Sequence, residues 1–83
     1  MTSIHVLLSS IRDVKNFVTA ATNQLCDIDV VSGRYIIDAK SIMGLFSLDL
    51  EKPIQVCIHG TNEDAEQFCA LIRSCIVDAP SGE

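Results

Sequence analysis

Four short segments of the chain are rich in β-forming residues, and apolar and polar residues alternate in the first and the last of them; this pattern predicts four β-strands. In the first segment Ile4, Val6 and Leu8 point to the buried side, and His5 points the other way. The last segment alternates most regularly, and Pro53 before it indicates that a new element starts there. The predicted strands cover residues 4–8, 28–31, 34–38 and 54–59.

Two longer helices are predicted where apolar residues recur at steps of three and four. The first begins after Ser10, which forms a capping pair with Asp13, and it ends near Cys26. The second begins after Thr61, which forms the same kind of pair with Asp64. The predicted buried stripes are Ile11, Val14, Phe17, Val18, Ala21 and Leu25 in the first helix, and Ala65, Phe68, Cys69, Ile72 and Cys75 or Ile76 in the second.

The segment of residues 40–48, Lys-Ser-Ile-Met-Gly-Leu-Phe-Ser-Leu, predicts a third, short helix with Ser41 as its N-cap. Its large apolar side chains are too closely spaced to point in one direction on a helix of 3.6 residues per turn. One part of them belongs in the core, and the rest should be exposed. The segment therefore predicts a docking surface for another protein.

The order of predicted elements is β-α-β-β-α-β-α, with Ser32 and Gly33 as the turn of a hairpin. Short alternating strands and helices of this kind are typical of an α+β fold with its helices on one face of a single sheet. We expect one domain over residues 1–83, with residues 78–83 as a flexible tail.

The net charge of −5 opposes the phosphate backbone, so nucleic-acid binding is not expected, and an acidic surface suits basic protein partners. No apolar run is long enough for a membrane span and no secretory signal is visible, so we expect a cytoplasmic protein without membrane insertion. Four cysteines would allow a disulfide framework in a secreted chain. Their spacing and apolar surroundings instead favour buried, reduced thiols, and no metal or other cofactor is predicted.

The segment of residues 40–48 resembles the regulatory-serine segment of HPr, the phosphocarrier family of the bacterial phosphoenolpyruvate:sugar phosphotransferase system. The element order and the chain length are similar to those of the same family. The resemblance implies an open-faced β-sandwich with four antiparallel strands in the order 1-4-2-3 and three helices on one face. In HPr of low-GC Gram-positive bacteria this serine is phosphorylated by HPr kinase/phosphorylase for catabolite regulation, which implies that Ser41 is a phosphorylation site. The alternative is that Ser41 is a helix cap and nothing more.

The second family site is a histidine in a His-Ala-Arg-Pro sequence at the start of the first helix, which accepts a phosphoryl group from Enzyme I. Aligning the first helices places Arg12 at the histidine, Val14 at the arginine and Lys15 at the proline. A guanidinium stays protonated and cannot act as the phosphoryl acceptor, and no histidine lies between His5 and His59. The resemblance therefore implies a member of the family that has lost histidine phosphotransfer.

The resemblance also implies protein partners, which would be components of the phosphotransferase system, HPr kinase or a transcriptional regulator. The family's apolar docking positions fall on Ile42, Met43 and Phe46, for which core packing is the alternative. Arg12 and Lys15, together with Arg34, would form a small phosphate-binding patch, unless they are only a solvated face. The predicted site residues are Ser41 for regulatory phosphorylation, Ile42, Met43 and Phe46 for partner binding, and Arg12 and Lys15 for phosphate binding.

His5, Cys57 and His59 form a further candidate group, because neighbouring first and fourth strands would bring them to the outer face of the sheet. Such a group would suit zinc or copper, or would include a relocated phosphoryl acceptor; the simpler alternative is that the two histidines have no special role. A different class of function is a constitutive interaction module, monomeric or oligomeric, without phosphorylation. An autonomous enzyme is not predicted, because the sequence contains no paired catalytic carboxylates, no nucleophile with its base and no phosphate-binding loop.

Overall fold

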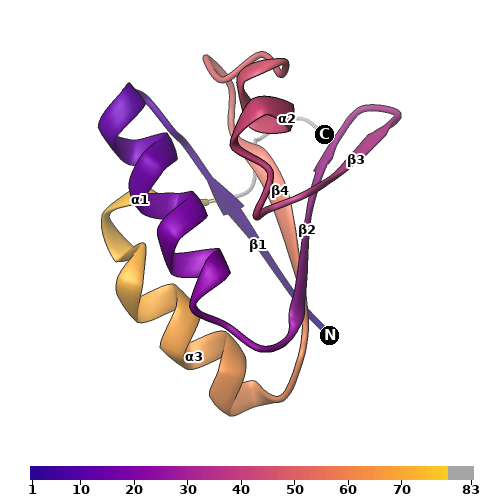
Figure 1. Ribbon diagram of the computed structural model, residues 1–83, viewed down its shortest axis with the longest axis vertical. Helices are drawn as coiled ribbons and strands as arrows, with labels where there is room; N and C mark the ends of the chain where they lie inside the picture. Colours follow the sequence, from indigo (N-terminus) through magenta and orange to yellow (C-terminus); the bar gives the residue numbers. More distant parts are fainter. Residues whose placement is uncertain (79–83) are drawn as a thin grey trace.

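A computed structural model of the chain describes residues 1–78, and Figure 1 shows its arrangement. The predicted tail of residues 78–83 lies, from residue 79 on, outside the described residues. Within residues 1–78 no helix is long and apolar enough to cross a membrane. The elements are β1 (Thr2–Val6), α1 (Ile11–Thr22), β2 (Asp27–Ser32), β3 (Tyr35–Asp38), α2 (Ile42–Phe46), β4 (Ile54–His59), α3 (Asn62–Leu71), the 3₁₀ turn η1 (Arg73–Cys75) and β5 (Ile76–Val77).

The strands form one antiparallel sheet in the order β3-β2-β4-β1-β5. The first four strands confirm the expected order 1-4-2-3, and the short β5 extends the sheet beside β1. Residues opposite one another share a face, so one face of the sheet is apolar and the other is mixed. The apolar inner face is formed by Val6, Ile28, Val30, Ile54, Val56 and Ile58, all of them buried.

All three helices contribute to the core on this inner face. Phe17 of α1 and Phe68 of α3 meet edge to face with their ring centroids 5.6 Å apart, which holds the two long helices together. Leu45 is the fully buried residue of α2. Figure 1 shows α1 and α3 side by side along one part of the sheet, with α2 beyond them near β3. The prediction of helices on one face of a single sheet is therefore confirmed.

The predicted helix caps are present, with one difference. Thr61 and Asp64 form the full capping box at the start of α3, each side chain accepting the other residue's backbone N–H. Ser10 Oγ accepts the N–H of Asp13 at 3.1 Å, but the Asp13 carboxylate accepts from the N–H and hydroxyl of Ser9. The Asp13 carboxylate thus accepts hydrogen bonds from Ser9, the residue before the cap, and not from the backbone of the cap residue Ser10.

Two predicted boundaries and one predicted stripe residue in the first part of the chain are wrong. β1 covers residues 2–6. Leu8 is buried as expected, but it lies in the loop after β1 and not in the strand. α1 ends at Thr22, and the fully exposed Leu25 lies in the turn after it and is not part of a helical stripe. Ile11 was also expected in the stripe but is 64% exposed, because the first residue of α1 extends past the edge of the core.

The last helix is shorter than expected because the chain turns back to the sheet. α3 ends at Leu71, and η1 follows it with Cys75 buried at its end. The carbonyl of Cys75 accepts the N–H of Leu7 at 2.8 Å, and Ile76 then pairs with Val6. Ile76 is therefore a strand residue. Cys75 and Ile76, whose spacing predicted another helical turn, instead lie beside the edge of β1.

Candidate functional site

Ser41 is exposed and caps α2. Its Oγ accepts the backbone N–H of Gly44 at 3.2 Å, and its carbonyl accepts the N–H of Leu45 at 3.1 Å. The N–H of Ser41 donates to the carbonyl of Asp38 at 2.9 Å, which ties the cap to the end of β3. The N–H groups of Ile42 and Met43 lie in the first turn, where a helix offers no internal acceptor. A hydroxyl and two available donors therefore meet at one exposed point.

Gly44 allows this cap to pack closely on β3. A Cβ at Gly44 would lie 2.7 Å from Cγ2 of Ile37 and 3.1 Å from the Oγ of Ser41. The first distance is shorter than real Cβ contacts allow, so a larger residue would require either the Ile37 side chain or α2 to shift. The glycine of the segment thus fixes the position of the hydroxyl against the sheet.

The apolar residues of α2 divide between core and surface, as expected from their spacing. Leu45 is fully buried and Ile42 is half-buried against the core. Met43 is 78% exposed and Phe46 is 44% exposed. Of the three predicted docking residues, Met43 and Phe46 are therefore presented on the surface, and Ile42 is shared between surface and core.

The start of α1 lies beside the end of α2. Phe46 and Leu50 line a hollow of about 290 Å³ together with Ser10 and Ile11 at the beginning of α1. Ile11 and Leu50 were not predicted as surface residues: the spacing of Ile11 from Val14 matched a buried stripe, and Leu50 stood in no regular element. The geometry joins the candidate docking helix to the first helix through this shared apolar hollow.

The register chosen from sequence for the histidine site conflicts with burial. Val14, which was aligned with the phosphate-holding arginine, is only 1% exposed and belongs to the core. A side chain at that position points into the protein and cannot hold a phosphate at the surface. The residue at the start of the helix is Ser10, and Arg12, two residues later, is exposed.

The predicted basic patch is only partly assembled. Arg12 and Lys15 are both exposed in the first two turns of α1. Arg34 lies in the turn between β2 and β3, and Figure 1 shows this turn on the other side of the molecule from the start of α1. Arg34 therefore does not join Arg12 and Lys15.

The outer face of the sheet carries the two histidines, but it does not bring them together. His5 lies opposite Gln55, four positions along β4 from His59. The Nε2 atom of His59 is 2.9 Å from the carboxylate of Asp29, and Cys57 Sγ lies 3.7 Å from the Oγ of Ser3. Among residues 1–78 there is no group of three or more metal-ligating side chains. The Asp29 carboxylate also occupies His59 Nε2, so that ring nitrogen is not free to accept a phosphoryl group.

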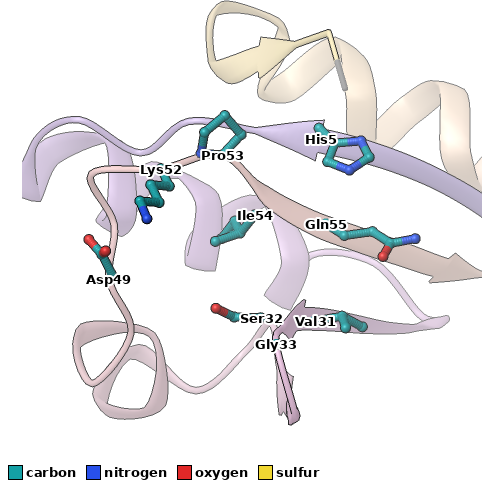
Figure 2. Close-up of a pocket in the computed structure, with 9 residues that line it drawn as sticks. All are labelled: His5, Val31, Ser32, Gly33, Asp49, Lys52, Pro53, Ile54 and Gln55. Carbon is teal, nitrogen blue, oxygen red and sulfur yellow. The ribbon is translucent and has the colours of Figure 1, made fainter. Parts of the chain in front are cut away.

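Figure 2 shows a second hollow, of about 390 Å³, which shares no residue with the hollow at Phe46. His5 and Gln55 come from adjacent strands at one side of it, and Lys52 and Asp49 come from the loop before β4. Because cationic and anionic side chains line the same open space, its charge selects neither anions nor cations. The sequence assigned no role to this region as a whole.

The four cysteines are free thiols, as expected, but only Cys75 is buried, and the other three are half-buried. Burial raises the pKa of the Cys75 thiol above its ordinary value of 9.0, and the carboxylate of Asp13 raises it further, while a hydrogen bond with Ser74 lowers it. Burial also raises the pKa of Cys69. Neither thiol is activated as a nucleophile, which agrees with the expected structural role.

Comparison with known proteins gives this site a context. Residues 10–78 match the sequence model of the PTS-HPr family, described as "PTS HPr component phosphorylation site". No curated protein sequence matches the chain at a significant level.

Two solved structures share the fold. HPr-C-His from Thermoanaerobacter tengcongensis has a TM-score of 0.71 and 24% identity, with 89% of this chain and 93% of that chain covered. The phosphocarrier protein HPr from Bacillus anthracis str. Ames has a TM-score of 0.69 and 25% identity, with 89% and 95% covered. Since the family model spans most of the chain, this protein belongs to the HPr family of the phosphotransferase system.

Proposed function

We propose that this protein is a regulatory HPr whose binding to other proteins is controlled by phosphorylation of Ser41, without histidine phosphotransfer. The observation that carries the proposal is the exposed hydroxyl of Ser41 at the start of α2, followed within five residues by the exposed side chains of Met43 and Phe46. A modification at Ser41 would change the charge of the surface that these two side chains present. Members of the HPr family act as phosphocarriers that bind other proteins and are not enzymes, and this arrangement is consistent with such a role.

The physical chemistry of the cap supports phosphorylation in the folded state. In the reaction, the Ser41 oxygen forms a bond to the γ-phosphorus of ATP, the bond to the β-phosphate oxygen breaks, and ADP leaves while a base of the kinase takes the hydroxyl proton. The phosphate would then sit by the N–H groups of Ile42 and Met43, where the positive end of α2 favours an anion by about 0.3–1 kcal/mol. Leu45 lies one turn further along α2, is fully buried and would keep its packing.

Loss of the carrier function is supported at the start of α1. The family reaction needs an imidazole at the helix start, with an arginine nearby. We infer that Ser10, not Arg12, holds the histidine position, because Ser10 caps α1 and Arg12 then holds the position of the arginine two residues later. Asp13 would replace the proline, and its carboxylate is already bonded to the N–H of Ser9, so it would repel a phosphate there.

The proposed partners are proteins of the phosphotransferase system, HPr kinase and a transcriptional regulator, all acting in the cytoplasm. They would bind over Met43, Phe46 and the hollow that Phe46 shares with Ile11. The acidic chain suits basic partner surfaces, and direct binding to nucleic acid is not part of the proposal.

The experiment is incubation of the purified protein with HPr kinase and ATP, followed by mass spectrometry of its peptides. We expect one phosphate, on Ser41, and none on the Ser41→Ala variant. Ser47 is the matched control, because it is the exposed C-cap residue of the same helix and its hydroxyl donates to the carbonyl of Gly44 at 2.6 Å. Ser47→Ala should be phosphorylated like the wild type. A wild type that stays unmodified, while another HPr protein is labelled as a positive control in the same reaction, would favour the alternative function, a constitutive interaction module without phosphorylation.

A further inference from the structure

Strand β3 lies at one end of the sheet formed by the described residues. It pairs with β2 through four residues, from Tyr35 to Asp38. Among residues 1–78 no other strand pairs with its second edge, since β3 ends the strand order. Figure 1 shows the β2–β3 hairpin at the outside of the molecule, and Ile36 in its middle is 71% exposed. An exposed, apolar strand edge is a template for pairing with another chain.

The direction of the main-chain groups along β3 follows from one bond. The N–H of Ala39 donates to the carbonyl of Ile28 at 2.9 Å, so the main-chain groups of Ala39 face β2. Alternate residues of a strand face the same side, so those of Tyr35 and Ile37 also face β2. The N–H and carbonyl of Ile36, and the N–H of Asp38, consequently face the open edge. The carbonyl of Asp38 is already an acceptor for Ser41.

The sequence of this edge is complementary to itself. When two copies of β3, each with the turn residue Arg34 directly before it, run antiparallel with Ile36 opposite Ile36, each Arg34 comes opposite the partner's Asp38. Moving the register by two residues in either direction places a charged residue opposite Ile36 and separates the opposite charges. Charge complementarity therefore selects a second copy of this chain in one register, even though each copy carries a net charge of −5.

We propose that two copies of this protein form a symmetric dimer by antiparallel pairing of their β3 edges about a two-fold axis at Ile36. Two main-chain hydrogen bonds join the two Ile36 residues, and the N–H of each Asp38 donates to the carbonyl of the partner's Arg34. Tyr35 packs on the partner's Ile37 on the helix face, and the Arg34–Asp38 charge pairs lie on the outer face. The contact is isologous, so it closes as a dimer and does not propagate.

This interface is small, so a weak dimer is expected. Four main-chain bonds and a few side-chain pairs place it below the standard size of stable complexes, with a Kd of about 10 μM to 1 mM. It uses β3 and not the α2 surface proposed for partner binding, so dimer formation and Ser41 phosphorylation can succeed or fail separately.

Sedimentation equilibrium of the wild type from about 10 μM to 1 mM tests the proposal. The first variant is Ile36→Pro, which removes the outward N–H but no bond to β2, so the monomer should stay folded by circular dichroism. It should weaken the dimer at least about tenfold. Ile36→Val, which keeps the donor and the strand, is the matched control and should dimerise like the wild type.

A charge exchange tests the register. Arg34→Asp should raise the Kd about tenfold, and adding Asp38→Arg to the same chain should return it to within about threefold of the wild type. Met43→Asp should leave the dimer unchanged. Any one of four results would overturn the proposal. The wild type stays monomeric at about 1 mM, or the Ile36→Pro variant dimerises like the wild type. Alternatively, the charge exchange does not restore the Kd, or Met43→Asp abolishes the dimer.

Discussion

The backbone N–H of Gly44 donates to the Oγ of Ser41, and the absence of a side chain at Gly44 is what allows this cap to lie against β3. A Cβ there would lie 2.7 Å from Cγ2 of Ile37. The glycine thus relates the candidate phosphorylation site directly to the sheet, and the site keeps its position only while this contact stays small.

Gly44→Ala should lower the free energy of unfolding by about 1–2 kcal/mol, because the clash with Ile37 outweighs the gain of about 1 kcal/mol in helix propensity. Chemical denaturation measures the change. In an Ile37→Ala background, which removes the clashing methyl group, the same substitution should be neutral or stabilising. Equal losses in both backgrounds would show that the close approach of Gly44 to Ile37 does not hold α2 in place.

Met43 and Leu45 should behave in opposite ways although they are two residues apart in α2. Met43→Asp should change stability by less than about 0.5 kcal/mol, because Met43 is exposed, and it should weaken phosphorylation by HPr kinase through a higher KM. Leu45→Ala should cost about 2–5 kcal/mol, because Leu45 is fully buried. Thermal melting and kinase kinetics give both values; a Met43→Asp protein with wild-type KM would remove Met43 from the docking surface.

Restoring the family sequence should restore the carrier reaction only in the register that the structure favours. Ser10→His combined with Asp13→Pro creates His-Ile-Arg-Pro with Arg12 in place, and we expect it to accept an acid-labile phosphate from phosphoenolpyruvate and Enzyme I. Arg12→His is the control and should accept none. Labelling of Arg12→His, without labelling of the double variant, would support the register predicted from sequence and contradict the one inferred from the cap.

The buried thiols predict a loss of stability at alkaline pH. Cys69 and Cys75 have raised pKa values in the folded protein, so their contribution is fully present below the unfolded pKa of about 9 and is lost as pH rises through the higher folded pKa. The free energy of unfolding should therefore fall more steeply above pH 9 in the wild type than in a Cys69→Ala, Cys75→Ala variant. Parallel slopes in the two proteins would contradict the assignment.

Much of the fold could be predicted because local patterns and tertiary packing agree. The alternation in β4 and the capping pairs at Ser10 and Thr61 correspond to elements at the expected places. The errors fall where periodicity continues past the end of an element. Leu25 and Ile76 continue a helical spacing, but the turn after Thr22 and the pairing with β1 determine their positions. These are tertiary effects that spacing alone does not report.

The candidate site was less predictable than the fold. The segment around Ser41 was recognisable because its residues are consecutive. Its apolar side chains were too many for one face of a helix, and in the structure some of them are buried and others exposed, as predicted. The register at the start of α1 was predicted wrongly although the sequence held a signal against it. The helical spacing already placed Val14 in the buried stripe, which conflicts with aligning Val14 with an arginine that holds a phosphate at the surface, and the structure shows Val14 in the core. The neighbourhood of Ile11 and Phe46 also depends on how two helices pack, which no local pattern contains.

The most direct test of the account is a comparison of the two phosphoryl donors on the wild-type protein. One sample receives ATP and HPr kinase, the other receives phosphoenolpyruvate and Enzyme I, and the modified residue in each is identified by mass spectrometry under conditions that preserve phosphohistidine. The account predicts acid-stable phosphate on Ser41 in the first sample and no phosphate in the second. Acid-labile phosphate on His5 or His59 in the second sample would contradict it.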